Sequence, residues 1–151
     1  MKIQETIKDD FIISTDKAKL DVELIHHYLC HESYWAKNIP MPVVEKSIEG
    51  SFCFGIYHGS RQVGFARVIT DHASFAYLAD VFVIADYRGK GLSKWLMGTI
   101  MNHPDLQGLR RWLLATRDAQ GLYAQFGFTP LDKPDRIMGR RPFEEYPQIN
   151  S

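Results

Sequence analysis

The stretch from Ser74 to Ile100 restricts the fold more than any other part of the sequence. Residues 74–84 are rich in β-branched and aromatic side chains, which is typical of a strand. A loop with two glycines, Arg88-Gly89-Lys90-Gly91, follows it. Beyond the loop, apolar residues recur at helical spacing, at Leu92, Trp95, Leu96 and Ile100. A strand that passes through a short loop into a helix predicts an α/β unit.

An antiparallel hairpin is predicted before this unit. Residues 51–58 alternate in polarity, residues 59–60 (Gly-Ser) form a tight connection, and residues 63–69 read as the return strand. After the helix, residues 112–116 predict a further strand. A strand–helix–strand crossover favours parallel pairing, so the sheet is expected to be mixed.

The other expected elements lie toward the two ends of the chain. They are a first strand at 11–13, a helix capped by Ser14, Thr15 or Asp16, a second helix at 43–49, a short helix at 118–126, and final strands at 128–129 and 136–141. The sequence therefore predicts one α/β (α+β) domain over residues 1–151, with a mixed, mostly antiparallel sheet and helices on both faces.

Composition limits the partners of such a domain. The formal net charge is zero, which argues against a general nucleic-acid binder. No apolar run is long enough to span a membrane, and the two cysteines give no disulfide framework, so a cytoplasmic protein is expected. Residues 88–117 are nonetheless locally basic, through Arg88, Lys90, Lys94, Arg110, Arg111 and Arg117. A basic segment on a neutral protein suits a small anionic ligand.

The glycine loop supplies what such a ligand needs. Two glycines let the backbone approach closely, and the start of the following helix adds unpaired N–H groups and the positive end of its dipole. Together with Arg88, Lys90 and Lys94, these features predict a phosphate or pyrophosphate site. The P-loop pattern does not occur, and Lys94 takes the place of the third glycine of a dinucleotide fingerprint, so both of those readings are rejected.

At this point the sequence resembles the GNAT acetyltransferases. Their acetyl-CoA loop reads [QR]-x-x-G-x-[GA], and residues 88–93 match its first and fourth positions, with Ser93 at the sixth. A second segment, residues 118–128, resembles the family's N-x-x-A-x-x-[FY]-[YF]-x-x-x-G-F motif. Tyr123 and the final Gly-Phe of this segment fall in register with the motif.

The resemblance implies a cofactor, its contacts and two catalytic side chains. Acetyl-CoA would lie along the strand and on the loop, at Phe82, Val83, Ile84, Arg88, Gly89, Lys90, Gly91, Leu92, Ser93 and Lys94. Tyr123 holds the position of a tyrosine that protonates the departing thiolate. Asp80 holds a position where an acidic residue acts as base, although it could equally bond an arginine or the backbone.

The acceptor side is less defined by the sequence. Tyr34 and Trp35 lie between the two early helices, where the family builds its acceptor pocket, and Asp71 is a weaker candidate. No metal site is expected, because His27 and His31 lack an obvious third ligand. The function implied is an N-acetyltransferase that moves an acetyl group to a primary amine of a small molecule or peptide. A non-catalytic acyl-CoA-binding module, a longer acyl donor and a homodimer remain open.

Overall fold

The computed structural model describes residues 2–147, and its centre is one six-stranded sheet. The strands lie in sequential order: β1 (Glu5–Lys8), β2 (Phe11–Ser14), β3 (Phe52–His58), β4 (Arg61–Thr70), β5 (Phe75–Val83) and β6 (Arg111–Leu114). Neighbouring strands pair antiparallel, except β5 and β6, which pair parallel. The predicted α/β fold with a mixed, mostly antiparallel sheet is confirmed.

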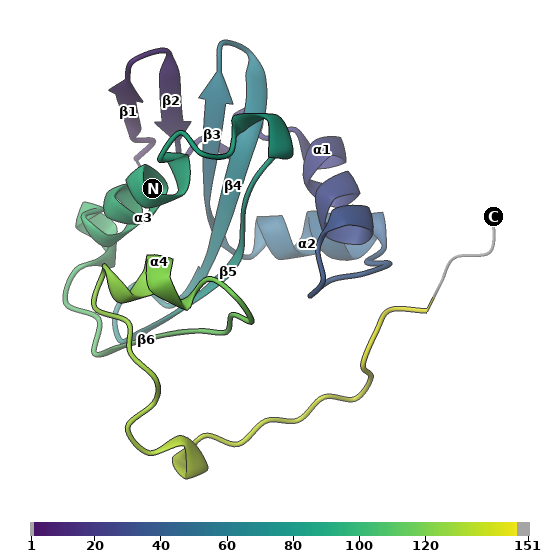
Figure 1. Cartoon of the computed structure of the whole chain (residues 1–151), viewed down its shortest axis with the longest axis vertical. Coiled ribbons are helices and arrows are strands. Elements are labelled where there is room, and N and C mark those ends of the chain that lie inside the picture. Colours follow the sequence, from purple (N-terminus) through teal and green to yellow (C-terminus); the bar gives the residue numbers. More distant parts are fainter. Residues whose placement is uncertain (1, 148–151) are drawn as a thin grey trace.

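Helices cover both faces of this sheet, as predicted. Figure 1 shows α1 (Val22–His27) and α2 (Met41–Glu49) on one side, and α3 (Leu92–Met101) and α4 (Gln120–Ala124) on the other. The central strand β3 is accordingly buried on both faces from Phe52 to Tyr57. The largest fully buried side chains of the protein include Phe54 and Ile56 on β3, Phe65 on β4, and Leu96 and Ile100 on α3. None of the helices in residues 2–147 has the length and apolar character that crossing a bilayer requires.

The first helix begins later than predicted, because two aspartates each cap a separate segment. The Asp16 carboxylate accepts a hydrogen bond from the Ala18 amide at 3.0 Å, but the 3-10 turn that it caps ends at Lys19. The chain restarts at Asp21, whose carboxylate accepts from the Leu24 amide at 3.1 Å and begins α1. A π-helical turn, Tyr28–Glu32, then leads into the connection to α2.

The two ends of the chain differ most from the prediction. β1 was not expected; it pairs with β2 although Ile7, its only large apolar side chain, is 72% exposed. The strands predicted at 128–129 and 136–141 are absent, since residues 115–147 contain α4 and a 3-10 turn, Pro134–Arg136, but no strand. Every residue from 129 to 145 is exposed, and Figure 1 shows this segment leaving the body below β6 and α4.

Candidate active site

The glycine loop forms an open cradle at the carboxyl end of β5. Gly89 and Gly91 have φ angles of 78° and 77°, in the left-handed region that favours glycine. Gly91 is the N-cap of α3 and offers no capping side chain, so no side chain of the described residues caps the first turn of the helix. A cavity of about 260 Å³ lies against these amides, lined by Val83, Tyr87, Arg88, Gly89, Gly91, Leu92, Ser93, Lys94 and Leu122.

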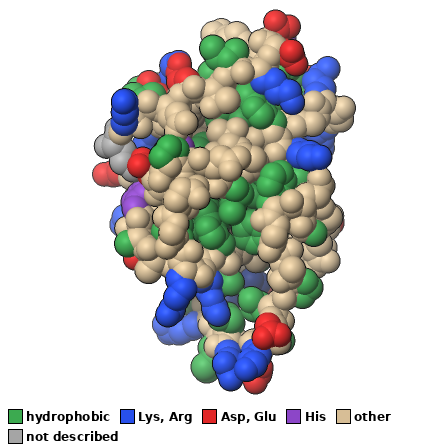
Figure 2. Space-filling model, turned by 90° about the vertical axis from the view of Figure 1, so that its left-hand side faces the viewer, with side chains coloured by type: hydrophobic (Ala, Val, Ile, Leu, Met, Phe, Trp, Pro, Cys, Tyr) green, Lys and Arg blue, Asp and Glu red, His purple; other side chains and the backbone are tan. Residues whose placement is uncertain are grey.

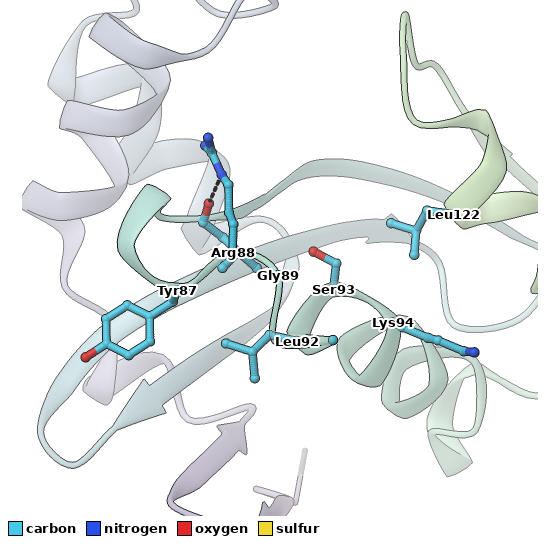
Figure 3. Close-up of a pocket in the computed structure, with 9 residues that line it drawn as sticks. Tyr87, Arg88, Gly89, Leu92, Ser93, Lys94 and Leu122 are labelled. Atoms are coloured by element: carbon cyan, nitrogen blue, oxygen red, sulfur yellow. Dashed lines mark hydrogen bonds between the residues drawn. The ribbon is translucent and has the colours of Figure 1, made fainter.

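The three basic side chains of this loop do not act alike. Lys90 and Lys94 are exposed, as a phosphate-binding role requires. Arg88 is also exposed, but its guanidinium is engaged by the protein: Nε donates to the Val83 carbonyl at 3.0 Å and Nη2 donates to the Tyr28 hydroxyl at 2.9 Å. Figure 3 shows the Arg88 side chain pointing away from Ser93 and Lys94. Its guanidinium therefore braces the loop against β5 and the early helices.

The strands β5 and β6 stop pairing before β5 reaches this cradle. The two strands pair from Phe75–Arg111 to Leu78–Leu114, where β6 ends while β5 continues to Val83. Within the described residues, the outer edge of β5 from Ala79 to Val83 thus has no strand partner. Phe82, Val83 and Ile84, predicted to contact the cofactor, lie buried at this point. An extended ligand could pair with the free edge as an added strand would.

A break in the regular pairing of β4 and β5 accompanies the opening. The register shifts between Phe65 and Arg67, and opposite this shift Asp80 adopts a φ of 55°. A non-glycine residue in that region carries strain of roughly 1–3 kcal/mol, which the surrounding contacts must hold. A register shift of this kind is a β-bulge, which bends the strand and changes the direction of its side chains.

Hydrogen bonds to the carboxylate of Asp80 hold this residue in its strained backbone conformation. Its Oδ1 accepts a hydrogen bond from Trp35 Nε1 at 2.8 Å, and its Oδ2 accepts from Arg67 Nε at 2.8 Å. Arg67 also donates through Nη1 to the Ser51 hydroxyl at 3.1 Å. The Asp80 side chain is 9% exposed and that of Arg67 is 16% exposed, so the pair is largely shielded from water. Both carboxylate oxygens are thus engaged within the protein.

Tyr123 is buried on α4, next in sequence to Leu122, which lines the cavity at the cradle. Burial raises the pKa of its phenol to about 12, with smaller contributions from Tyr34 and Asp118. The phenol is therefore fully protonated near neutral pH and serves as a hydrogen-bond donor. Within residues 2–147, no other group bonds to its hydroxyl. Its ring contacts Phe128 edge-on, with the centroids 6.2 Å apart.

Tyr34 ties the connection before α2 to the loop after β6. Its hydroxyl accepts a hydrogen bond from the Arg117 amide at 2.8 Å, and the Arg117 guanidinium lies 3.9 Å from the centre of its ring. Trp35 packs edge-on against Tyr34 at 5.1 Å between centroids. The two predicted acceptor residues therefore form a partly exposed aromatic wall beside Asp80 and Tyr123.

Asp71 lies at the opposite end of β5 and is not brought into this group. It is exposed in the β4–β5 turn, where its carboxylate accepts from the amides of Ala73, Ser74 and Phe75. The Ser74 hydroxyl and these amides hold its pKa well below the ordinary value. The structure supports a turn-forming role for Asp71 instead of contact with the acceptor.

Two residues of the site were not predicted from the sequence. Arg67 did carry a signal, since a charged residue interrupts the otherwise apolar strand at 63–69. Tyr28 carried none, because it fits the apolar face of a helix; in the structure it stacks on Phe82 at 4.0 Å between ring centroids and accepts from Arg88. Among the described residues, no group of three or more His, Cys, Asp or Glu side chains could hold a metal ion.

Comparisons with known proteins agree with this geometry. Residues 49–130 match the family model described as an acetyltransferase (GNAT) domain. A Gibberella zeae protein provisionally named an acetyltransferase is 32% identical over 146 residues, which covers 82% of this chain and 81% of that protein.

Solved structures show the same architecture. A Xanthomonas campestris pv. campestris protein described as belonging to the GNAT family is 53% identical, with a TM-score of 0.86 over 88% of this chain and 94% of that one. A GNAT family acetyltransferase from Elizabethkingia anophelis, solved with acetyl-CoA bound, has a TM-score of 0.62 at 12% identity and covers 83% of this chain and 80% of that one. The chain therefore belongs to the GNAT family of acetyltransferases.

Proposed function

We propose that this protein transfers the acetyl group of acetyl-CoA directly to a primary amine of a small molecule or peptide. The opening between β5 and β6 carries the proposal, because it leaves an edge of β5 free next to the amide cradle. Leu122, which lines the cavity of that cradle, directly precedes the buried Tyr123. The pyrophosphate of CoA would lie on the amides of residues 88–94, and its pantetheine arm would run along the free edge of β5. The Elizabethkingia anophelis relative, which shares the fold, binds acetyl-CoA.

One backbone amide is suitably oriented to polarise the thioester. The Ile84 amide donates to the Val63 carbonyl on the inner side of the sheet at 2.9 Å. Successive amides of a strand point to opposite edges, so the Val83 amide faces the opening. We assign it as the donor to the thioester oxygen, where negative charge develops as the amine attacks.

The reaction then needs two proton movements. The neutral amine attacks the thioester carbonyl carbon, an N–C bond forms, the C–S bond breaks, and the nitrogen loses a proton while the CoA sulfur gains one. A lysine-like amine has a pKa of about 10.4, so its neutral form is scarce near pH 7. Tyr123, kept protonated by burial, would donate a hydrogen bond to the departing sulfur.

Asp80 would contribute by positioning the acceptor wall. Its two oxygens hold Trp35 and Arg67, and the bulge holds its backbone. A general base must also reach the amine proton, directly or through one water. The engaged oxygens favour positioning over proton abstraction, and the pH dependence of the Asp80→Asn variant separates the two roles.

The test is release of free CoA thiol from acetyl-CoA across a panel of primary amines, peptides among them. The proposal predicts release above background with at least one amine and formation of the matching acetamide. Acetyl-CoA binding with no release for any amine would indicate a non-catalytic acyl-CoA-binding module instead. Repeating the assay with longer acyl chains would show whether acetyl is the preferred group.

A further inference from the structure

Tyr28 is a buried residue that contacts three parts of the candidate site. Its ring stacks on that of Phe82 in β5, with the ring centroids 4.0 Å apart and the planes inclined by 8°. The same ring lies 6.4 Å from that of Trp35 in the acceptor wall. Its hydroxyl accepts a hydrogen bond from Arg88 Nη2 at 2.9 Å. One side chain thus touches β5, the acceptor wall and the glycine loop.

The backbone of Tyr28 is held independently of these contacts. Tyr28 begins the π-helical turn that ends at Glu32, and its carbonyl accepts from the Ser33 amide at 2.8 Å. Its own amide donates to the carbonyls of Leu24 and Ile25. Single π-helical turns are frequent at functional sites. Because backbone and ring are both fixed, the hydroxyl is held in one place beside the loop.

The hydroxyl of Tyr28 restricts the orientation of Arg88. Arg88 is exposed, and a long exposed side chain has many rotamers open to it. The hydrogen bonds from Nε to the Val83 carbonyl and from Nη2 to Tyr28 select one of them. Hydrogen bonds that involve a charged group are stronger than neutral ones. Loss of the Tyr28 hydroxyl should therefore free the guanidinium to move.

Arg88 in turn fixes the last peptide group of β5. The peptide that joins Val83 to Ile84 is bound on both sides, because its carbonyl accepts from Arg88 and its amide donates to the Val63 carbonyl at 2.9 Å. Val83 also carries the amide that we assign to the thioester oxygen. The orientation of that amide therefore depends on the same bonds.

The loop carries other basic groups that can meet the anionic ligand. Lys90 and Lys94 are exposed beside the cradle. Figure 2 views the molecule from the left-hand side of Figure 1, where α3 lies, and shows further Lys and Arg side chains on this surface. The guanidinium of Arg88 is thus available to hold the protein in place of the ligand.

We propose that Tyr28 is a positioning residue, whose hydroxyl orients Arg88 so that Arg88 holds the end of β5 in the conformation that polarises the thioester. The effect on catalysis rests on the proposed function, but the orientation of Arg88 can be measured without turnover. Tyr28→Phe keeps the ring and removes only the hydroxyl. Tyr57→Phe is the matched control, because Tyr57 is a buried tyrosine of β3 whose hydroxyl has no hydrogen-bond partner among residues 2–147.

The first measurement is the rate at which the Arg88 Nε proton exchanges with water, by NMR of the full chain. We expect slow exchange in the unmodified protein and in Tyr57→Phe, and exchange several-fold faster in Tyr28→Phe. Equal rates in the three proteins would overturn the proposal. This result does not depend on turnover, whereas a failure of the proposed function would appear as no CoA release by the unmodified protein with any amine.

The second measurement compares kcat with the affinity for CoA. We expect kcat of Tyr28→Phe to fall about tenfold, as for a lost hydrogen bond to a charged group, while the Kd for CoA, which has no thioester oxygen, stays unchanged. Arg88→Gln should lower kcat at least as much, and adding Tyr28→Phe to it should cause no further loss, because both residues act through one contact. Additive losses, or a Kd for CoA weakened as much as kcat falls, would show a general structural role and overturn the proposal.

Discussion

At the scale of single residues, a substitution of Tyr123 tests the chemical step separately from the binding of acetyl-CoA. Tyr123→Phe keeps the ring contact with Phe128 and removes only the hydroxyl, which the structure leaves without a partner in residues 2–147. We expect kcat to fall about 100-fold, within the range for a lost proton donor, while the Kd for acetyl-CoA stays unchanged. Steady-state kinetics and calorimetry measure the two effects. Tyr77→Phe, on the other half of β5, is the control, and equal losses in both variants would contradict the assignment.

Asp80 is expected to position its neighbours and not to take the proton. Asp80→Asn can still accept from Trp35 but loses the charge that faces Arg67. We predict a KM for the amine raised several-fold, with the pH profile of kcat unchanged in shape. Asp10→Asn, at an exposed turn carboxylate, should change neither the KM for the amine nor the pH profile of kcat. Loss of an ascending limb from the pH profile would instead identify Asp80 as the general base.

His103 should make the fold sensitive to acid. Its side chain is 3% exposed and its ring packs edge-on against Phe52. Its Nδ1 accepts from the Asp105 amide, and its Nε2 has no hydrogen-bond partner among residues 2–147. Burial lowers its pKa below the ordinary 6.5, which Asp105 only partly offsets. The unfolded chain therefore binds a proton first, so the free energy of unfolding should decrease as pH falls below about 6.5.

Urea unfolding at several pH values between 7.5 and 5 measures this dependence. His103→Asn keeps an acceptor for the Asp105 amide and should flatten the dependence in this range. His31→Asn, at an exposed histidine, should leave the pH dependence of the unfolding free energy unchanged. If His103→Asn were as acid-sensitive as the unmodified protein, the acid sensitivity would come from other groups.

At the scale of elements, the cradle depends on the backbone conformation at Gly91. An alanine there would have to hold a φ of 77°, which costs about 1 kcal/mol of folding stability. Its Cβ would meet no atom of the described residues within 4 Å, so it would project into open space at the cavity where we propose that acetyl-CoA binds. We expect Gly91→Ala to weaken acetyl-CoA binding about tenfold beyond its effect on stability. That figure corresponds to about 1.4 kcal/mol of binding free energy.

Gly108 provides a matched control for this prediction. It has the same φ of 77° and equally free space around its Cβ, but it lies outside the cradle. Gly108→Ala should show the same loss of folding stability with no loss of affinity, by thermal unfolding and calorimetry respectively. Equal affinities of the two variants for acetyl-CoA would show that the loop amides do not contribute to its binding.

Elements with a strong local signal were predictable, and those that depend on a partner were not. Strands β3 to β5 and helix α3 show clear periodicity and formed where expected. β1 escaped prediction because one apolar residue in Glu5–Lys8 gives no alternation, and the strand forms only by pairing with β2. Residues 136–141 do carry apolar side chains, Ile137 and Met138, but both are exposed and the segment forms no strand, because no strand of the described chain pairs with it.

At the scale of the whole molecule, the glycine loop could be located from the sequence, whereas the contacts around Tyr34, Trp35 and Asp80 could not. The cradle is continuous in sequence, so its glycines and lysines indicated an anion site directly. The acceptor wall is built from contacts between distant segments: Trp35 with Asp80, Tyr34 with Arg117, and Tyr28 with Arg88. Those pairs depend on how the connection between α1 and α2 packs across the end of the sheet, which local patterns do not encode.

The central claim is that the cradle and the open edge of β5 bind acetyl-CoA. Calorimetric titration of the full chain with acetyl-CoA, CoA and NADH tests it most directly. The structure predicts binding of acetyl-CoA and CoA, weakened by Gly91→Ala but not by Gly108→Ala, with NADH not bound. Absence of acetyl-CoA binding to the folded protein would contradict the account and leave residues 88–94 as a turn without this ligand.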